Sequence, residues 1–418
     1  MRRPLAALIA GLLATPLFLI PAPAAAADIP CPKPKVAAPS RPPRPAVPAD
    51  DPADLAVGGD ALATHGLVVP EGSPKPPAIT ASTWLVADLD TGEVLGACDP
   101  HGYQTPASVQ KTLLAATAID QLDPKQVVTV TRGDLDIEPG SSAVGLIVGG
   151  KYPISTLWLG LLLNSGNDAA NALARVAGGG GKDGVANTVA AMNALAASLG
   201  ANQTHAVTPS GLDGKGQFTS AYDLALIGRV CLNNADFRKY ALTRTAQMPA
   251  QKTASRKVGG FQFQNENKLI YNYPGALGGK TGFTQLARHS YVGGAERGGR
   301  RLVVTVLGAE ARPLRGWEQG AKLLDWGFSL PKGTSVGNLV TPEEVAAAQA
   351  TTDAGEAAAP APGEKAGNTR PGAPRGLSVA AAISVAVVLT AAPLLLLLTQ
   401  RRRRRLSREM PRSPSRAR

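Results

Sequence analysis

The hydrophobic pattern of residues 83–328 changes period along the chain. Short apolar runs at 83–89 and 94–98 are joined by the turn sequence DTG, which predicts two strands in a tight hairpin. Alternation with a period of two returns at 290–293 and 301–307, which predicts two further strands. Strands are therefore expected at both ends of this region.

The segment between these strands has the residue spacing of helices. Apolar residues recur three and four positions apart in 108–122, 154–163, 168–176, 184–199 and 220–232, and a last amphipathic pattern covers 315–328. Strands at both ends of a helical middle predict an α+β domain. We expect an antiparallel sheet that is flanked by helices and carries a helical insert.

Aromatic residues mark the folded domain, because large rings dominate the burial of a core. Seventeen of the eighteen lie between Trp84 and Phe328. On this basis we place the domain at residues 75–330. The flanking segments are rich in Pro, Ala or Gly, and we expect an extended tether at 28–74 and a second linker at 331–376.

Residues 1–27 have the organisation of a secretory signal peptide. Two arginines precede an apolar stretch at 5–20, and three alanines at 25–27 form a small-residue cleavage site. An uncleaved membrane anchor is the alternative. The shortness of the apolar stretch, which a proline interrupts, favours the signal peptide.

A second apolar run, residues 377–399, contains 23 residues without a charge. At about 1.5 Å per residue, a helix of this length crosses a hydrocarbon core of about 30 Å. A buried core helix is the alternative to a single membrane span. The arginine block in the tail at 400–418 predicts a cytoplasmic C-terminus. We therefore expect a single-pass protein of the cell membrane, with residues 28–376 outside the cytoplasm.

The formal net charge of +12 is carried mainly by the two ends of the chain. The last eighteen residues account for +8 and the two N-terminal arginines for +2, which leaves +2 for residues 4–400. A nucleic-acid-binding protein concentrates its basic residues on the folded domain, where they contact phosphates. We therefore expect no nucleic-acid partner.

The chain has three cysteines, Cys31, Cys98 and Cys231, in the portion that we expect to be exported. Disulfides form in that compartment, but an odd number leaves at least one thiol unpaired within a monomer. A bridge between Cys98 and Cys231 is one option that the sequence leaves open. The four histidines are scattered singly and no HExxH or CxxC pattern occurs, so we expect neither a metal nor another cofactor.

Three polar clusters interrupt the apolar pattern. In the first, Ser108 and Lys111 lie three residues apart at the start of a predicted helix, so that both side chains share one helix face. A neutral lysine amine there can take the serine proton, and the helix N-terminus directs backbone N–H groups at the reacting oxygen. Taken alone, the motif is also that of an ordinary N-cap serine.

The second cluster, Ser165-Gly166-Asn167, directly follows the buried helix predicted at 154–163. A turn at that position can present a hydroxyl and an amide to a cleft. A plain helix-capping turn has the same composition.

The third cluster, Lys280-Thr281-Gly282-Phe283, lies on a predicted edge strand. Its glycine allows the backbone of a ligand to lie close to the chain. The spacing excludes a Walker phosphate loop, because Pro274 stands where that motif requires glycine.

Together the clusters match the motif set S-x-x-K, S-D-N and K-T-G, in that order and 57 and then 115 residues apart, with Gly166 in the Asp position. On these motifs the chain resembles D-alanyl-D-alanine carboxypeptidases of the low-molecular-weight penicillin-binding protein family, over about residues 81–330. The blocks NSGNDAANAL, SGLD and PGALGGKTGFT extend the resemblance. Ser210, where relatives often have histidine, and the run ARHS at 287–290, in place of a glycine-containing run, depart from it.

This resemblance implies a β-lactamase/transpeptidase-like fold. It also implies a serine peptidase that removes the terminal D-alanine from peptidoglycan stem pentapeptides, without a cofactor, and that β-lactams inhibit. The site residues that it implies are Ser108, Lys111 and Ser165 for catalysis, and Asn167, Lys280, Thr281, Gly282 and Phe283 for substrate binding.

The implied roles follow from the chemistry of each group. Ser108 would be the nucleophile and Lys111 its base, since burial and the charge of Lys280 lower the pKa of that amine. Ser165 would relay a proton to the leaving D-alanine. The N–H groups of Ser108 and Phe283 would form the oxyanion hole.

Two other functions share these motifs. A β-lactamase has the same motif order and deacylates with an added glutamate; Glu266 is the one glutamate between the second and third motifs, and it lies close to the third. A non-catalytic, membrane-tethered cell-wall-binding protein would keep the pocket without turnover.

Overall fold

The computed structural model describes residues 28–37, 39–254 and 256–358. The signal peptide predicted at 1–27, the span predicted at 377–399 and the tail at 400–418 lie outside these residues. Within the described part of the chain, no helix combines the length and the apolar composition that crossing a bilayer requires.

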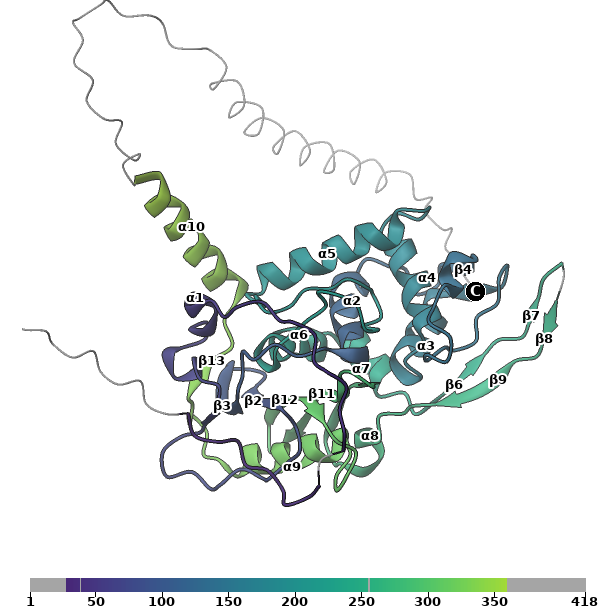
Figure 1. Ribbon diagram of the computed structural model, residues 1–418. Coiled ribbons are helices and arrows are strands. Elements are labelled where there is room, and N and C mark those ends of the chain that lie inside the picture. Colours follow the sequence, from purple (N-terminus) through teal and green to yellow (C-terminus); the bar gives the residue numbers. More distant parts are fainter. Residues whose placement is uncertain (1–27, 38, 255, 359–418) are drawn as a thin grey trace, which may run out of the picture. The chain divides into compact units, whose positions relative to one another are not determined.

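A seven-stranded sheet forms the centre of the domain, with the strand order β1-β3-β2-β12-β11-β10 and with β13 paired to β3 (Figure 1). Each of these pairs is antiparallel. The strands are β1 (Leu67–Val68), β2 (Thr83–Asp88), β3 (Glu93–Cys98), β10 (Ala276–Thr284), β11 (Arg288–Arg297), β12 (Arg300–Ala309) and β13 (Gly337–Asn338). The strand that carries the third motif, β10, lies at one end of the sheet order.

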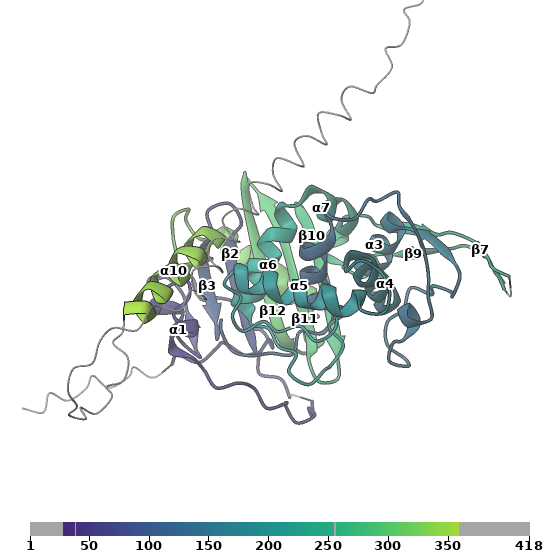
Figure 2. The ribbon, with the colours of Figure 1, turned by 90° about the horizontal axis from the view of Figure 1, so that it is seen from above.

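Both faces of the sheet are buried, because successive side chains of a strand point to opposite sides. On β2, Trp84 and Val86 belong to the core beneath α9 (Gly316–Ser329), and Leu85 belongs to the core on the opposite face. That second face is covered by α6 (Ala221–Asn233), as Figure 2 shows from above. The sheet is thus packed between helices, as the apolar pattern predicts.

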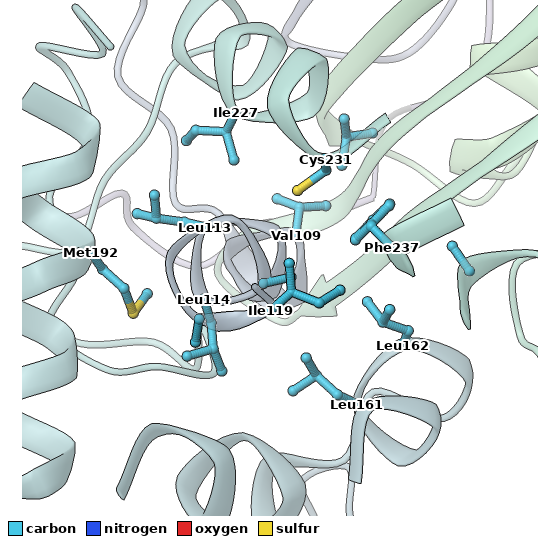
Figure 3. Close-up of a cluster of buried hydrophobic side chains, with 14 of the residues drawn as sticks. Val109, Leu113, Leu114, Ile119, Leu161, Leu162, Met192, Ile227, Cys231 and Phe237 are labelled. Atoms are coloured by element: carbon cyan, nitrogen blue, oxygen red, sulfur yellow. The ribbon is translucent and has the colours of Figure 1, made fainter. Parts of the chain in front are cut away.

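The helical insert packs around one short, almost wholly buried helix, α2 (Lys111–Ala118). Figure 3 shows side chains from α2 and its surroundings meeting those of Leu161, Met192 and Phe237 in one apolar cluster. The elements that contact α2 are the 3₁₀ turn η2 (Ala107–Gln110) before it, α4 (Asn167–Ala177), α5 (Gly184–Ser198) and α6. The helices α3 (Ile154–Leu163) and α7 (Ala235–Ala241) contribute side chains to the same core. The polar residues of the first motif therefore begin a helix whose remaining surface is core.

The helices and strands predicted from the hydrophobic pattern are confirmed to within a few residues. Shorter elements and a long hairpin that projects from the domain have no counterpart in the prediction (Figure 1). The hairpin consists of β6 (Thr245–Met248), β7 (Gln251–Lys252), β8 (Lys257–Val258) and β9 (Phe261–Gln264). The other short elements without a predicted counterpart are β1, β13 and α7, given above, and α1 (Pro52–Leu55), η1 (Asp60–Leu62), β4 (Val127–Thr129), η3 (Gly133–Leu135), β5 (Lys151–Pro153) and α8 (Leu269–Asn272).

Residues 28–74, interpreted above as a tether, pack against the domain in this structure. Strand β1 joins the sheet next to β3, and Leu62 is fully buried in the core. A disulfide joins Cys31 to Cys98 with a Cα–Cα distance of 5.9 Å, and Cys231 is a buried free thiol. The bridge that the sequence left open between Cys98 and Cys231 is therefore not the one formed.

Part of the segment interpreted as a linker, residues 331–376, is also ordered against the domain. Strand β13 pairs with β3, and Leu339 is buried in the core. The helix α10 (Pro342–Ala358) follows it. Its first turn contains two glutamates, and the Glu344 carboxylate accepts a hydrogen bond from the Thr341 backbone N–H, which caps the helix.

Candidate active site

The Lys111 amine is the hub of a buried hydrogen-bond network. Its Nζ lies 2.8 Å from Ser108 Oγ, 2.7 Å from Asn167 Oδ1 and 2.8 Å from the Ser210 carbonyl oxygen. An amide oxygen and a carbonyl oxygen can only accept, so they use two N–H bonds of the amine. A neutral amine then has its lone pair left for the Ser108 hydroxyl, which is the arrangement that a general base needs.

The surroundings of Lys111 favour this neutral form. The side chain is fully buried, and burial is the largest cause that holds its pKa well below the ordinary value of 10.5. The positive charge of Lys280 lowers the pKa further, and the negative charge of Asp168 opposes the shift. Both causes predicted from the sequence are thus present.

The backbone is strained at two positions of the site, one directly before Ser108 and one at Ser165 itself. Ala107, directly before Ser108, has a φ of 51°, and Ser165 has a φ of 60°. Residues with a side chain rarely adopt this left-handed conformation, and such residues cluster at functional sites, where the surrounding structure holds them. The strain therefore points to Ser108 and Ser165 as parts of one site.

The second motif is held by a carboxylate that the sequence analysis did not single out. Asp168 is buried at the start of α4, and its two oxygens accept the backbone N–H groups of Val144, Gly145 and Leu146 at 2.9 Å. A Cβ added at Gly166 would lie 2.7 Å from Asp168 Oδ1, which explains glycine in the middle of this motif. The acidic residue at the first turn of the predicted helix was the available signal.

The third motif forms an edge strand against the start of the first. A Cβ added at Gly282 would lie 2.9 Å from the Ser108 nitrogen and 3.0 Å from the Val109 nitrogen. Among the described strands, β10 is paired with β11 alone, so its other edge is open to an extended ligand. Phe283, whose N–H is the second expected oxyanion donor, directly follows this glycine and is exposed.

Lys280 lies beneath that edge. Its Nζ is 2.7 Å from the Thr281 carbonyl oxygen, and only 1% of the residue is exposed. Burial lowers the pKa of its amine to about 8, while the carboxylate of Glu266 opposes the shift. The ammonium form therefore dominates at neutral pH and supplies the positive charge next to Lys111.

Five of the eight predicted site residues line one cleft of about 420 Å³. Ser108, Ser165, Thr281, Gly282 and Phe283 line it. Lys111 adjoins the cleft through its hydrogen bond with Ser108, and Asn167 adjoins it through its hydrogen bond with Lys111. No hydrogen bond among the described residues joins the Ser165 side chain to Ser108 or Lys111.

Other residues of the cleft were not predicted. Arg315 and Trp317 come from the start of α9, Ser142 from the loop that Asp168 holds, and Lys268 from α8's N-cap. Glu266, which the sequence analysis weighed as a β-lactamase base, lines the cleft as well. The sequence feature that could have pointed to Arg315 is its position as the first residue of a predicted helix, close after a predicted strand.

A family model described as D-alanyl-D-alanine carboxypeptidase matches residues 71–311, more than half of the chain. The chain belongs to this family. The resemblance inferred from the three motifs is thereby confirmed, and the protein is a serine-type D-alanyl-D-alanine carboxypeptidase by family.

The match covers most of one curated relative in this family and less than two thirds of another. The D-alanyl-D-alanine carboxypeptidase DacB2 of Mycobacterium tuberculosis is 44% identical over 277 residues, which cover 65% of this chain and 90% of the relative. DacD of Salmonella typhimurium is 36% identical over 61% of this chain, but the match spans only 64% of that relative.

Solved structures confirm the fold class. A D-alanyl-D-alanine carboxypeptidase from Mycobacterium tuberculosis is 43% identical, with a TM-score of 0.59 over 65% of this chain and 99% of that structure. The DD-transpeptidase of Streptomyces K15 is 28% identical, with a TM-score of 0.57 over 62% of this chain and all of that structure. The transpeptidase-like fold of the carboxypeptidase family is therefore present here.

Proposed function

We propose that the protein removes the terminal D-alanine from peptidoglycan stem pentapeptides through an acyl-enzyme at Ser108. The observation that carries this proposal is the buried Lys111 amine, 2.8 Å from Ser108 Oγ at the base of a cleft bordered by an open strand edge. An extended peptide pairs with such an edge and presents one carbonyl to the serine.

Acylation then proceeds on groups of this chain. Lys111 takes the Ser108 proton while Oγ attacks the carbonyl carbon of the penultimate D-alanine. The resulting ammonium has three hydrogens for its three neighbours, Ser108 Oγ, Asn167 Oδ1 and the Ser210 carbonyl. The N–H groups of Ser108 and Phe283 hold the oxyanion.

Collapse of this intermediate breaks the peptide bond and releases D-alanine. The leaving nitrogen receives a proton that passes from Lys111 through the Ser165 hydroxyl, since Ser165 lines the same cleft. Water then attacks the ester at Ser108 and returns the hydroxyl and the free tetrapeptide. A β-lactam mimics the scissile dipeptide and acylates the same serine.

The substrate carboxylate fits the positive charge of the cleft. Thr281 and Arg315 line it, and the Lys280 ammonium lies beneath the strand. A hydroxyl and a guanidinium hold a carboxylate by charge-assisted hydrogen bonds. This arrangement favours a peptide with a free C-terminus and thus a carboxypeptidase.

The test is release of D-alanine from a stem pentapeptide by the full-length chain in detergent. Wild type should release D-alanine and Ser108→Ala should release none. Labelling by a fluorescent penicillin without release would instead favour the cell-wall-binding protein, and absence of both reactions would remove the proposal.

A β-lactamase is the second candidate, because Glu266 lines the cleft with Ser108. A glutamate there can activate the deacylating water. If it does, wild type should turn over penicillin quickly and Glu266→Gln should trap the acyl-enzyme. Slow penicillin release from both proteins would favour the carboxypeptidase.

For the location of the protein, we propose an exported catalytic domain held by the span at 377–399, with the tail at 400–418 in the cytoplasm. The Cys31–Cys98 disulfide supports an oxidising compartment. Protease added to intact cells should digest the catalytic domain and spare an epitope at the C-terminus. Protection of the domain would contradict this orientation.

A further inference from the structure

One carboxylate outside the cleft holds two guanidinium groups from distant parts of the chain. Glu310 follows β12 and is 5% exposed. Its Oε1 accepts a hydrogen bond from Arg41 Nε at 2.8 Å and lies 2.7 Å from Arg41 Nη2, and its Oε2 accepts a hydrogen bond from Arg288 Nη2 at 2.8 Å. Neither pair belongs to the motifs or to the proposed chemistry.

Arg288 is the member of this cluster that reaches the active site. It begins β11, and its φ of 59° lies in the left-handed region that disfavours an arginine. Its guanidinium lies 5.7 Å from the centre of the Phe283 ring. The next residue, His289, pairs with Phe283 across the two strands, and its ring packs against the Phe283 ring in a tilted arrangement with 4.7 Å between ring centres.

The position of the Phe283 backbone thus depends on how the start of β11 is held. Thr284 and Arg288 close the hairpin between β10 and β11, and Phe283 and His289 are the next pair. A relaxed Arg288 would change the twist of this pair and move the Phe283 N–H away from the position that the oxyanion requires.

At its other end the cluster is anchored by the N-terminal segment. Besides Glu310, Arg41 donates to the Gly308 carbonyl at 3.0 Å. Arg44 donates to Ser82 Oγ at 3.0 Å, and Lys33 donates to the Ala81 carbonyl. The Cys31–Cys98 disulfide fixes the beginning of the same segment. Arg41 is therefore presented to Glu310 by a segment with several attachments.

We propose that Arg41 and Glu310 are positioning residues for the oxyanion hole, which hold Arg288 in its left-handed conformation and thereby the Phe283 N–H. The proposal rests on the function proposed above. Through Arg41, the N-terminal segment then contributes to catalysis, because a single arginine would hold the Glu310 carboxylate less rigidly than two do.

The first test compares Arg41→Leu and Glu310→Gln with wild type in the full-length chain. The measurements are the rate constant and the binding constant for acylation by a β-lactam, with melting temperature recorded alongside. The rate constant should fall roughly tenfold to a hundredfold, as for a displacement of about 1 Å, with little change in the binding constant. Arg41→Lys keeps the charge and should recover part of the rate.

Arg301→Leu is the matched control, because Arg301 pairs with Asp90 at the opposite end of β12 and does not line the cleft. It should leave acylation unchanged. An Arg41→Leu variant that melts earlier but acylates at the wild-type rate would overturn the proposal, since that is the behaviour of a purely structural ion pair.

A double-mutant cycle separates positioning from stability. Glycine adopts a left-handed conformation without strain, so Arg288→Gly removes the need for the ion pairs at that residue. In the Arg288→Gly background, Arg41→Leu should then change the acylation rate less than twofold. Equal effects of Arg41→Leu in both backgrounds would refute the mechanism, whereas a wild-type protein that neither acylates nor releases D-alanine would refute the underlying function instead.

Discussion

Two buried lysines with lowered pKa values organise the active site. Burial lowers the pKa of both amines, but Lys111 also experiences the positive charge of Lys280, so that its pKa falls well below the ordinary value while that of Lys280 falls to about 8. The shift drives Lys111 toward the neutral form that a base needs, while Lys280 remains mainly a cation at neutral pH. Lys111 could not act as a base with the pKa of a solvent-exposed lysine.

The rate of acylation should therefore depend on pH through both residues. Only the neutral Lys111 accepts a proton, so the rate should fall as the pH falls through its lowered pKa. Above about pH 8, Lys280 loses its charge, and affinity for the substrate carboxylate should fall. Stopped-flow acylation and KM for the pentapeptide across pH measure the two limbs.

Two variants test which lysine is responsible for each limb of the pH profile. Lys280→Met removes the charge that depresses the pKa of Lys111, so the acidic limb should shift to higher pH. Lys280→Arg keeps a cation at all accessible pH values, so the alkaline limb should move upward. An acidic limb that is identical in wild type and Lys280→Met would show that Lys111 is not the titrating base.

Gly282 provides a test of the oxyanion hole. In Gly282→Ala, the new Cβ would stand 2.9 Å from the Ser108 nitrogen, so β10 must move away from the serine. Loss of an oxyanion donor lowers the acylation rate by roughly a hundredfold to a thousandfold, and we expect a fall of this size with little loss of penicillin affinity.

Gly259→Ala is the control for this substitution, because a Cβ there meets nothing within 4 Å. It should acylate like wild type. A Gly282→Ala enzyme of wild-type rate would mean that the close approach of β10 to Ser108 contributes nothing to catalysis.

The eight site residues stand out in the sequence because each lies in a recognisable motif. The network around Lys111 could not be predicted completely. The Ser210 partner is a backbone carbonyl 99 residues away, which leaves no trace in residue type. Arg288 shows the converse, because its sequence position departs from the family pattern and its left-handed backbone gives that departure a structural meaning.

At the scale of elements, the loop before β5 is shaped by Asp168, a residue at the start of α4. The Asp168 carboxylate accepts backbone N–H groups from three consecutive residues of that loop, Val144 to Leu146. The same loop places Ser142 at the cleft. One side chain therefore joins the second motif to the wall of the site.

In Asp168→Asn, an amide NH₂ would replace one of the accepting oxygens and face backbone N–H donors. Unpaired buried donors cost about 1–3 kcal/mol each, so we expect the free energy of unfolding to fall by roughly 2–4 kcal/mol. D-Alanine release should fall with it. Chemical denaturation and the release assay measure the two effects.

Asp183→Asn is the matched control, because Asp183 is exposed and its side chain makes no capping hydrogen bond to α5. It should change stability by less than about 0.5 kcal/mol. An Asp168→Asn protein as stable as this control would show that the loop does not depend on the carboxylate.

Long elements with a buried face could be predicted, and largely exposed elements could not. The helix α3 lies in the core and is an almost wholly apolar run with the bounds that the pattern predicts. The strands β6 and β9 expose most of their residues, so no apolar periodicity marks them. The projecting hairpin was missed for this reason.

At the scale of the whole molecule, the sheet itself decides which cysteines can pair. Cys98 belongs to the core on the α9 face of the sheet, together with Trp84 and Trp326. Cys231 belongs to the core on the opposite face, where its Sγ lies 3.2 Å from the Thr112 carbonyl oxygen. A disulfide cannot form between two thiols on opposite faces of a sheet. The face on which each cysteine lies is not visible in the spacing of the cysteines along the chain.

The pairing of Cys31 with Cys98 instead closes a loop of 67 residues between the N-terminal segment and β3. In the chain-entropy model, closing a loop of this length stabilises the folded state by roughly 4 kcal/mol. We therefore expect the double variant Cys31→Ser/Cys98→Ser to melt about 8–16 °C below wild type, since 1 kcal/mol corresponds to about 2–4 °C in a domain of this size.

Calorimetry of the full-length chain with and without reductant measures this effect and contains its own control. Reductant should lower the melting temperature of wild type toward that of the double variant and leave the variant unchanged, because the buried Cys231 thiol has no disulfide to lose. If the Arg41 contacts also depend on the bridge, the variant should acylate more slowly at temperatures where it is fully folded. Equal melting temperatures for wild type and variant would show that the N-terminal segment is held by its other contacts alone.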